Sequence, residues 1–259
     1  QRLASYYADY WAGVGPMAGG EPLKNAPVEN CANLAFSFLT GAMDEGFYRN
    51  KLTGYTKTAF DSLQAKYAGR LMNHSADSLF RHRIELIPNC GHSIDYSLTT
   101  PWLKTYTRNP YPHTFMWEDY PMDGQRRQGF YNLYVMKRPK AADGLKDASG
   151  EDRDYYEMDI QDNVIRLSVK KVTYQTVERD PVYGIDLKFT KSYHPVIGGK
   201  WKIYLNDQLV DMNRPVTVFI NNRKAFEGKL VPRMEDMITS CMEYFDPCRV
   251  FPASVDVAL

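Results

Sequence analysis

Two side chains in this sequence have the types and surroundings that acid–base chemistry requires. His92 follows residues 83–88 (RIELIP), whose alternation of polar and apolar side chains predicts a half-buried strand closed by a turn. A histidine on such a loop suits a general base, because the preceding Gly91 lets the backbone approach a neighbour closely. The alternative is a surface histidine that only caps the turn.

Asp44 lies in the same kind of place. Residues 35–39 (AFSFL) predict a buried strand that stops at TGAMDEG, so Asp44 also follows a strand end. In a parallel sheet such loops converge at one edge, and a carboxylate there can hold an imidazole in the tautomer that activates a hydroxyl. We therefore predict that the Asp44 carboxylate faces the His92 imidazole within hydrogen-bond reach. Glu45, the next residue on the loop, is the alternative acid.

The third member of such a triad is expected to be a serine at a strand-to-helix turn with the pattern G-x-S-x-G. The sequence contains no such pattern. Ser5 lies inside a predicted helix without flanking glycines, and Ser93 directly follows the base. Neither serine is therefore a credible nucleophile.

The surrounding elements are expected to position these loops. Helical spacing indicates a helix over residues 1–10, an apolar run indicates a strand at 12–17, and a second helix with one apolar face ends near Gly69. This order of helices and strands predicts an α/β fold with parallel strands. An unpaired strand at 12–17 would leave an apolar edge that recruits another chain.

The second half of the chain has a different composition. Residues 106–120 are aromatic and proline-rich and are expected to wrap the first domain as an extended segment. Residues 137–153 have the composition of a linker. Short β-rich runs then predict a small antiparallel β-sandwich; they lie at 155–160, 164–169, 172–177, 202–205 and 216–220.

One helix is expected after Pro232, where apolar residues recur at helical spacing up to Phe245. Its methionine-rich stripe is interpreted as a contact with the core rather than a cofactor site. The predicted domains are therefore residues 1–138, a linker at 139–151, and a β-rich domain at 152–259.

Composition excludes several classes of function. The 259 residues are 44% hydrophobic with a net charge of +1, which argues against a nucleic-acid partner held by bulk electrostatics. No apolar run reaches the length of about 18 residues that a membrane span needs. The four cysteines lack metal-like spacing, so we expect no metal or cofactor, although Cys241 and Cys248 are candidates for a disulfide. The absence of an initiator methionine and a signal peptide indicates a processed or truncated product.

Several stretches resemble one family of enzymes. They are PMAGGEPLKNAP (16–27), TGAMDEGFYRN (40–50), GHSIDYSLTTPWL (91–103), RNPYP (108–112) and MDGQRRQGFYNL (122–133). These stretches look like the C-terminal part of an α/β-hydrolase-fold serine hydrolase, most like a group of bacterial esterases and peptidases, common in Bacteroidetes, with an appended β-rich domain. The resemblance implies that Asp44 is the acid, that His92 is the base, and that the nucleophilic serine lies shortly before Gln1. It also implies a periplasmic or secreted location.

Two classes of function follow. The first is a serine hydrolase that cleaves a small ester or peptide by acyl transfer, of which this chain carries the acid and base; the isolated chain would then be inactive. The second is a non-catalytic module whose β-rich part binds a glycan or a partner protein. An acid and a base on one sheet edge favour the first class.

Overall fold

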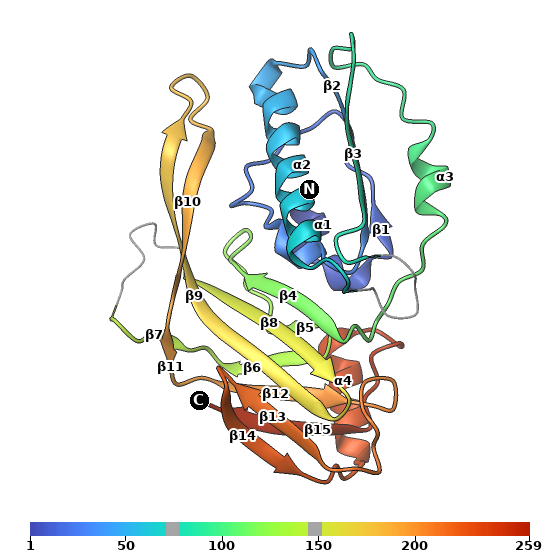
Figure 1. Cartoon of the computed structure of the whole chain (residues 1–259), viewed down its shortest axis with the longest axis vertical. Coiled ribbons are helices and arrows are strands. Elements are labelled where there is room, and N and C mark those ends of the chain that lie inside the picture. Colours follow the sequence, from blue (N-terminus) through green and yellow to red (C-terminus); the bar gives the residue numbers. More distant parts are fainter. Residues whose placement is uncertain (71–77, 145–151) are drawn as a thin grey trace. The chain divides into compact units, whose positions relative to one another are not determined.

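The computed structural model describes residues 1–70, 78–144 and 152–259 (Figure 1). The chain divides into two compact units. The first contains Gln1–Asn109 and Tyr174–Lys191, and the second contains Pro110–Thr173 and Ser192–Leu259. This division differs from the predicted domains, because strands near residues 114–137 pair inside the second unit. Part of the predicted linker, residues 145–151, lies outside the described residues.

The first unit is built on a three-stranded parallel sheet in the order β1-β2-β3. The strands are β1 (Gly13–Val14), β2 (Ala35–Gly41) and β3 (His82–Ile87). All seven residues of β2 are buried, as expected for a central strand covered on both faces. The helices are α1 (Arg2–Tyr6), η1 (Ala8–Tyr10), η2 (Val28–Cys31), η3 (Gly46–Tyr48), α2 (Arg49–Lys66) and α3 (Thr99–Leu103).

Helix α2 follows β2 in the chain and packs against β2 and β3 (Figure 1). Leu52 and Phe60 are buried on its inner face, and the ring of Phe60 lies 4.7 Å from that of Phe36 in β2. The predicted edge strand at residues 12–17 is shorter than expected. It comprises β1 and an isolated bridge between Met17 and Leu39, so the edge offers few backbone groups to another chain.

The second unit is built on two main sheets and one helix, and the end of β9 and the start of β10, within residues 174–191, belong to the first unit. A six-stranded sheet has the order β14-β13-β9-β8-β4, with β10 also paired to β9, and an antiparallel four-stranded sheet has the order β15-β12-β6-β5. The elements of the first are β4 (Thr114–Asp119), β8 (Arg153–Gln161), β9 (Val164–Arg179), β10 (Asp186–His194), β13 (Val216–Ile220) and β14 (Arg223–Gly228). The others are β5 (Gly129–Phe130), β6 (Leu133–Lys137), β7 (Lys140–Ala141), β11 (Val196–Ile197), β12 (Lys200–Leu205), α4 (Met234–Tyr244) and β15 (Ala253–Ala258).

Aromatic side chains from both sheets form the core of the second unit. Trp117 of β4 stacks on Phe130 of β5 with ring centroids 5.3 Å apart, and Tyr156 of β8 lies 6.3 Å from Trp201 of β12. The segment that was expected to wrap the domain as extended chain therefore supplies a buried strand, β4. Its rings contribute core packing in a sheet rather than a surface covering.

The predicted fold class is wrong. Strands account for 38% and helices for 20% of the structure, and among the described strands only β1, β2 and β3 form an all-parallel sheet. Within residues 1–70, 78–144 and 152–259, one strand–helix–strand crossover, β2-α2-β3, follows the expected wiring, and these residues do not show the pattern of an α/β hydrolase. The second sheet system is not purely antiparallel either, since β9 and β13 pair in parallel.

The prediction that the methionine stripe of α4 faces the core is also wrong. The buried residues of this helix are Asp236, Ser240 and Tyr244. Each finds a hydrogen-bond partner beneath the helix: Ser254 donates to Asp236, the Phe251 N–H donates to Ser240, and Tyr244 donates to the Leu133 carbonyl. Burial of these polar groups is tolerated because they are hydrogen-bonded.

Candidate active site at Asp44 and His92

The loops after β2 and β3 are joined by backbone hydrogen bonds. The last pair in the register of these strands is Gly41 with Ile87. Beyond it, the Ala42 N–H donates to the Ile87 carbonyl at 2.9 Å, and the Met43 N–H donates to the Cys90 carbonyl at 2.9 Å. The two strand ends therefore deliver the residues that follow them, Asp44 and His92, to one place.

The expected contact between the two side chains is present. His92 Nδ1 lies 2.9 Å from Asp44 Oδ2. An ionised carboxylate only accepts hydrogen bonds, so Nδ1 carries the hydrogen and donates it to Asp44. In the neutral ring, Nε2 then holds the lone pair that a general base uses. The Asp44 carboxylate is only 4% exposed, whereas the His92 side chain is 65% exposed.

Two further residues hold Asp44 in position. Arg49, the first residue of α2, donates from Nη1 to Asp44 Oδ1 at 3.0 Å. The Asn50 N–H donates to the Asp44 carbonyl at 3.0 Å, and its side-chain amide donates to the Ala42 carbonyl at 3.0 Å. Neither Arg49 nor Asn50 was predicted to belong to the site; the signal in the sequence is a pair of polar residues that open a helix just after the Asp44 loop. Glu45, the alternative acid, is exposed.

These contacts govern the ionisation of Asp44. Burial alone would raise the pKa of this carboxyl. The hydrogen bonds from His92 and Arg49, together with their charges, outweigh burial and hold its pKa below the usual value. Asp44 is therefore ionised at neutral pH and able to stabilise a protonated His92 ring.

Contacts between histidine and aspartate recur in this structure, so the distance alone does not single out His92. His82 lies 3.0 Å from Asp61 through Nε2, and its Nδ1 lies 2.8 Å from the Phe80 carbonyl. His194 bonds Thr173 through Nε2 at 2.9 Å and lies 3.5 Å from Asp143.

In each of those two histidines both ring nitrogens are engaged. Among the described residues, no hydrogen-bond partner lies at Nε2 of His92. Nε2 is therefore free to exchange a proton with a substrate, a property that separates His92 from His82 and His194.

Ser5 and Ser93 do not complete a triad with Asp44 and His92. Ser5 is buried, and its hydroxyl donates to the Pro27 carbonyl at 2.7 Å. Ser93 is exposed beside the base. Within residues 1–70, 78–144 and 152–259, no serine or threonine hydroxyl forms a hydrogen bond with His92.

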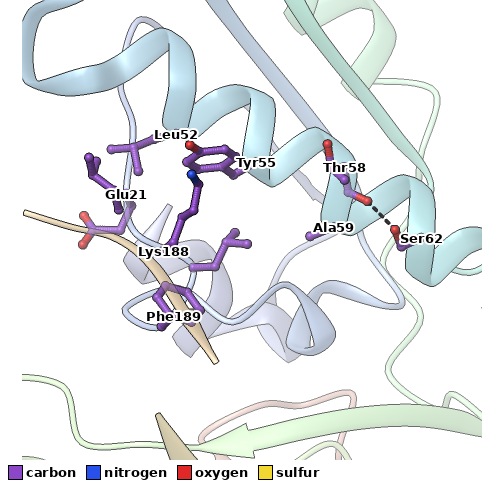
Figure 2. A pocket seen from close by; sticks show the side chains of 10 residues that line it. Glu21, Leu52, Tyr55, Thr58, Ala59, Ser62, Lys188 and Phe189 are labelled. Atoms are coloured by element: carbon purple, nitrogen blue, oxygen red, sulfur yellow. Dashed lines mark hydrogen bonds between the residues drawn. The ribbon is translucent and has the colours of Figure 1, made fainter. Parts of the chain in front are cut away.

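The first unit also has a hollow of about 520 Å³ between α2 and the start of β10 (Figure 2). Its walls are mostly apolar, including Leu52, Ala59 and Phe189, and it is not lined by His92. In Figure 2 the Lys188 amine points toward the hydroxyl of Tyr55. Lys188 also forms an ion pair with Glu178 at 2.7 Å, so its charge is already balanced.

Other kinds of site are not evident. In the part of the chain that the structure describes, no group of three or more histidine, cysteine, aspartate or glutamate side chains is placed to hold a metal ion. No described helix is long and apolar enough to cross a membrane, in agreement with the sequence. Cys241 and Cys248 are free thiols.

Comparison with known proteins adds no family: no protein family, curated protein or solved structure matches this chain. The resemblance to serine hydrolases that the sequence motifs suggest therefore stays a prediction, and the site has to be interpreted from its own geometry.

Proposed function

We propose that Asp44 and His92 are the acid and the base of a hydrolase that cleaves a small ester or peptide by acyl transfer. The observation that carries the proposal is the 2.9 Å contact between a buried, ionised carboxylate and an exposed ring whose Nε2 is free. The two other histidines that contact aspartates, His82 and His194, have both ring nitrogens engaged, so neither has a nitrogen available for proton transfer.

The proposed chemistry follows from the tautomer. Nε2 of His92 removes the proton of a hydroxyl group while the oxygen of that hydroxyl attacks the substrate carbonyl carbon. The imidazolium ring that forms is stabilised by the Asp44 carboxylate. The same proton then passes to the leaving group, which restores the neutral ring. The described residues supply no hydroxyl at Nε2, so the nucleophile is either a serine outside them or a water molecule.

Activity is best tested on the longest natural product of the gene, with p-nitrophenyl esters and peptide p-nitroanilides as substrates. We expect His92→Ala and Asp44→Asn to lower kcat/KM by about 10⁴–10⁶-fold, the range found when the base or the acid of a triad is removed. His194→Ala and Asp143→Asn are matched controls, because they break another aspartate–histidine contact. These controls should change kcat/KM by less than about 3-fold.

The 259-residue chain allows a second, independent measurement. Two-dimensional ¹H–¹⁵N NMR of the imidazole should show hydrogen on Nδ1 of neutral His92, and Asp44→Asn should shift the ring toward the other tautomer. Hydrolysis that is unchanged in His92→Ala would reject the proposal. An inactive full-length protein would reject it too and would favour the glycan- or protein-binding module.

A further inference from the structure

Helix α4 exposes its apolar side. Met234, Met237, Ile238, Met242 and Phe245 are between 42% and 90% exposed, and Cys241 between them is exposed as well. We call these six residues the α4 face. The opposite side of the helix is buried through hydrogen-bonded polar groups, so the amphipathic pattern is inverted relative to an ordinary surface helix.

The end of this helix carries a second unusual feature. Phe245 adopts the left-handed conformation, with φ 47° and ψ 39°, and its side chain is 90% exposed. That backbone conformation is unfavourable for a residue with a bulky side chain, and glycine usually occupies it. The ring of this strained residue lies in solvent, which is the arrangement of an interface anchor rather than of a core residue.

We propose that the α4 face joins two copies of this chain in an antiparallel, twofold-symmetric pair. The six positions of the α4 face are symmetric about the point between Thr239 and Ser240, so the face has the same spacing when the helix is reversed. In an antiparallel pair, Met234 therefore opposes Phe245, Met237 opposes Met242, and Ile238 opposes Cys241. Such self-complementarity is what a closed twofold interface requires.

The exposed area and the direction of the helices agree with a second copy as the occupant. The exposed fractions of the five larger side chains correspond to roughly 600 Å² per copy, so a pair would bury about 1,200 Å², the lower end of specific interfaces. The antiparallel arrangement places the N-terminus of each helix beside the C-terminus of the other, so the two helix dipoles attract each other. Methionine side chains adapt readily to such a contact.

Sedimentation equilibrium from about 1 to 200 μM tests the pair. We expect a monomer–dimer equilibrium, and Met242→Glu should weaken the dimer at least 10-fold. Val182→Glu is the matched control, because Val182 is 75% exposed but lies outside the α4 face. A wild-type protein that is monomeric at 200 μM, or a dimer that Met242→Glu does not weaken, would overturn the proposal. Binding of the wild-type protein to phosphatidylcholine vesicles without dimer formation would overturn it too.

Two variants separate loss of the interface from damage to the fold. Phe245→Gly relieves the left-handed backbone, so the thermal midpoint of the monomer should rise while the dimer weakens at least 10-fold. In a Cys90→Ser, Cys248→Ser background, Ile238→Cys should form intermolecular disulfides with Cys241 on oxidation. Absence of this cross-link in a chain that still dimerises would reject the antiparallel register.

Discussion

Gly41 controls the spacing of the two loops that bear Asp44 and His92, and its substitution is the sharpest test of the site. A Cβ atom at Gly41 would lie 1.9 Å from the Gly91 carbonyl oxygen and 2.3 Å from that of Cys90. Real Cβ atoms come no closer than 3.0 Å to such atoms, so Gly41→Ala must separate the strand ends by about 1.1 Å. The atoms in conflict belong to the backbone, so no side chain can rotate to relieve them.

The displacement has two measurable consequences. Forcing packed backbone apart costs about 2–3 kcal/mol, which should appear as a lower free energy of unfolding in urea followed by circular dichroism. The segment that moves leads directly into His92, whose hydrogen bond to Asp44 is 2.9 Å and fails beyond about 3.5 Å. A shift of 1.1 Å would lengthen the hydrogen bond beyond 3.5 Å. The ¹H–¹⁵N NMR signals of the His92 imidazole should then no longer show the hydrogen held on Nδ1 by Asp44.

Two glycines serve as controls for this experiment. No atom lies within 4 Å of a Cβ placed at Gly91 or at Gly54, and neither has a positive φ. Gly91→Ala should therefore change stability by less than about 0.5 kcal/mol, and Gly54→Ala, inside α2, should stabilise the chain by about 0.5–1 kcal/mol. If Gly41→Ala is as stable as the wild type and keeps the His92 signals, the strand ends do not lie as close as described.

Three further changes test other contacts. Because the pKa of Asp44 is lower in the folded than in the unfolded chain, its ionisation stabilises the fold above about pH 4, and this stabilisation is lost as the pH falls through the folded pKa. The difference in urea midpoint between the wild type and Asp44→Asn should therefore shrink from pH 7 to pH 3. A difference that stays constant over this range would contradict the prediction. Glu118→Ala removes the 2.8 Å ion-pair partner of the buried Arg153 and should lower the free energy of unfolding by about 3–5 kcal/mol. Replacing both residues with methionine should recover much of this loss. Equal losses in the single and double variants would contradict the prediction. Trp117→Ala should cost about 3–5 kcal/mol in chemical denaturation because the ring is buried against Phe130, and a loss below about 1 kcal/mol would show that the core is packed differently.

The candidate site was accessible to sequence reasoning because it depends on local patterns. Burial of β2, the alternation in β3 and the helical spacing of α2 are encoded within a few residues each. Loops that follow two adjacent parallel strands must then meet at one edge, so the contact between Asp44 and His92 could be predicted without knowing the rest of the chain. Arg49 was missed because an arginine at the start of a helix has many alternatives to a loop carboxylate.

The second unit shows where the same reasoning fails. Strand propensity located several of its strands, but it does not say that β6 pairs with β12 or that β9 pairs in parallel with β13, because these partners lie about 50 or more residues apart. The expected α/β class failed for this reason: residues 114–137 were placed in the first domain, whereas β4 pairs with β8 and β6 pairs with β12.

Helix α4 separates the two kinds of information most clearly. The sequence by itself determined that residues 234–244 form a helix with one apolar and one polar side, because periodicity is a property of neighbouring residues. Only the tertiary structure decided which side is buried. The polar side faces inward because Leu133, Phe251 and Ser254 bring hydrogen-bonding groups to it from other parts of the chain, and no local pattern records where those groups will lie.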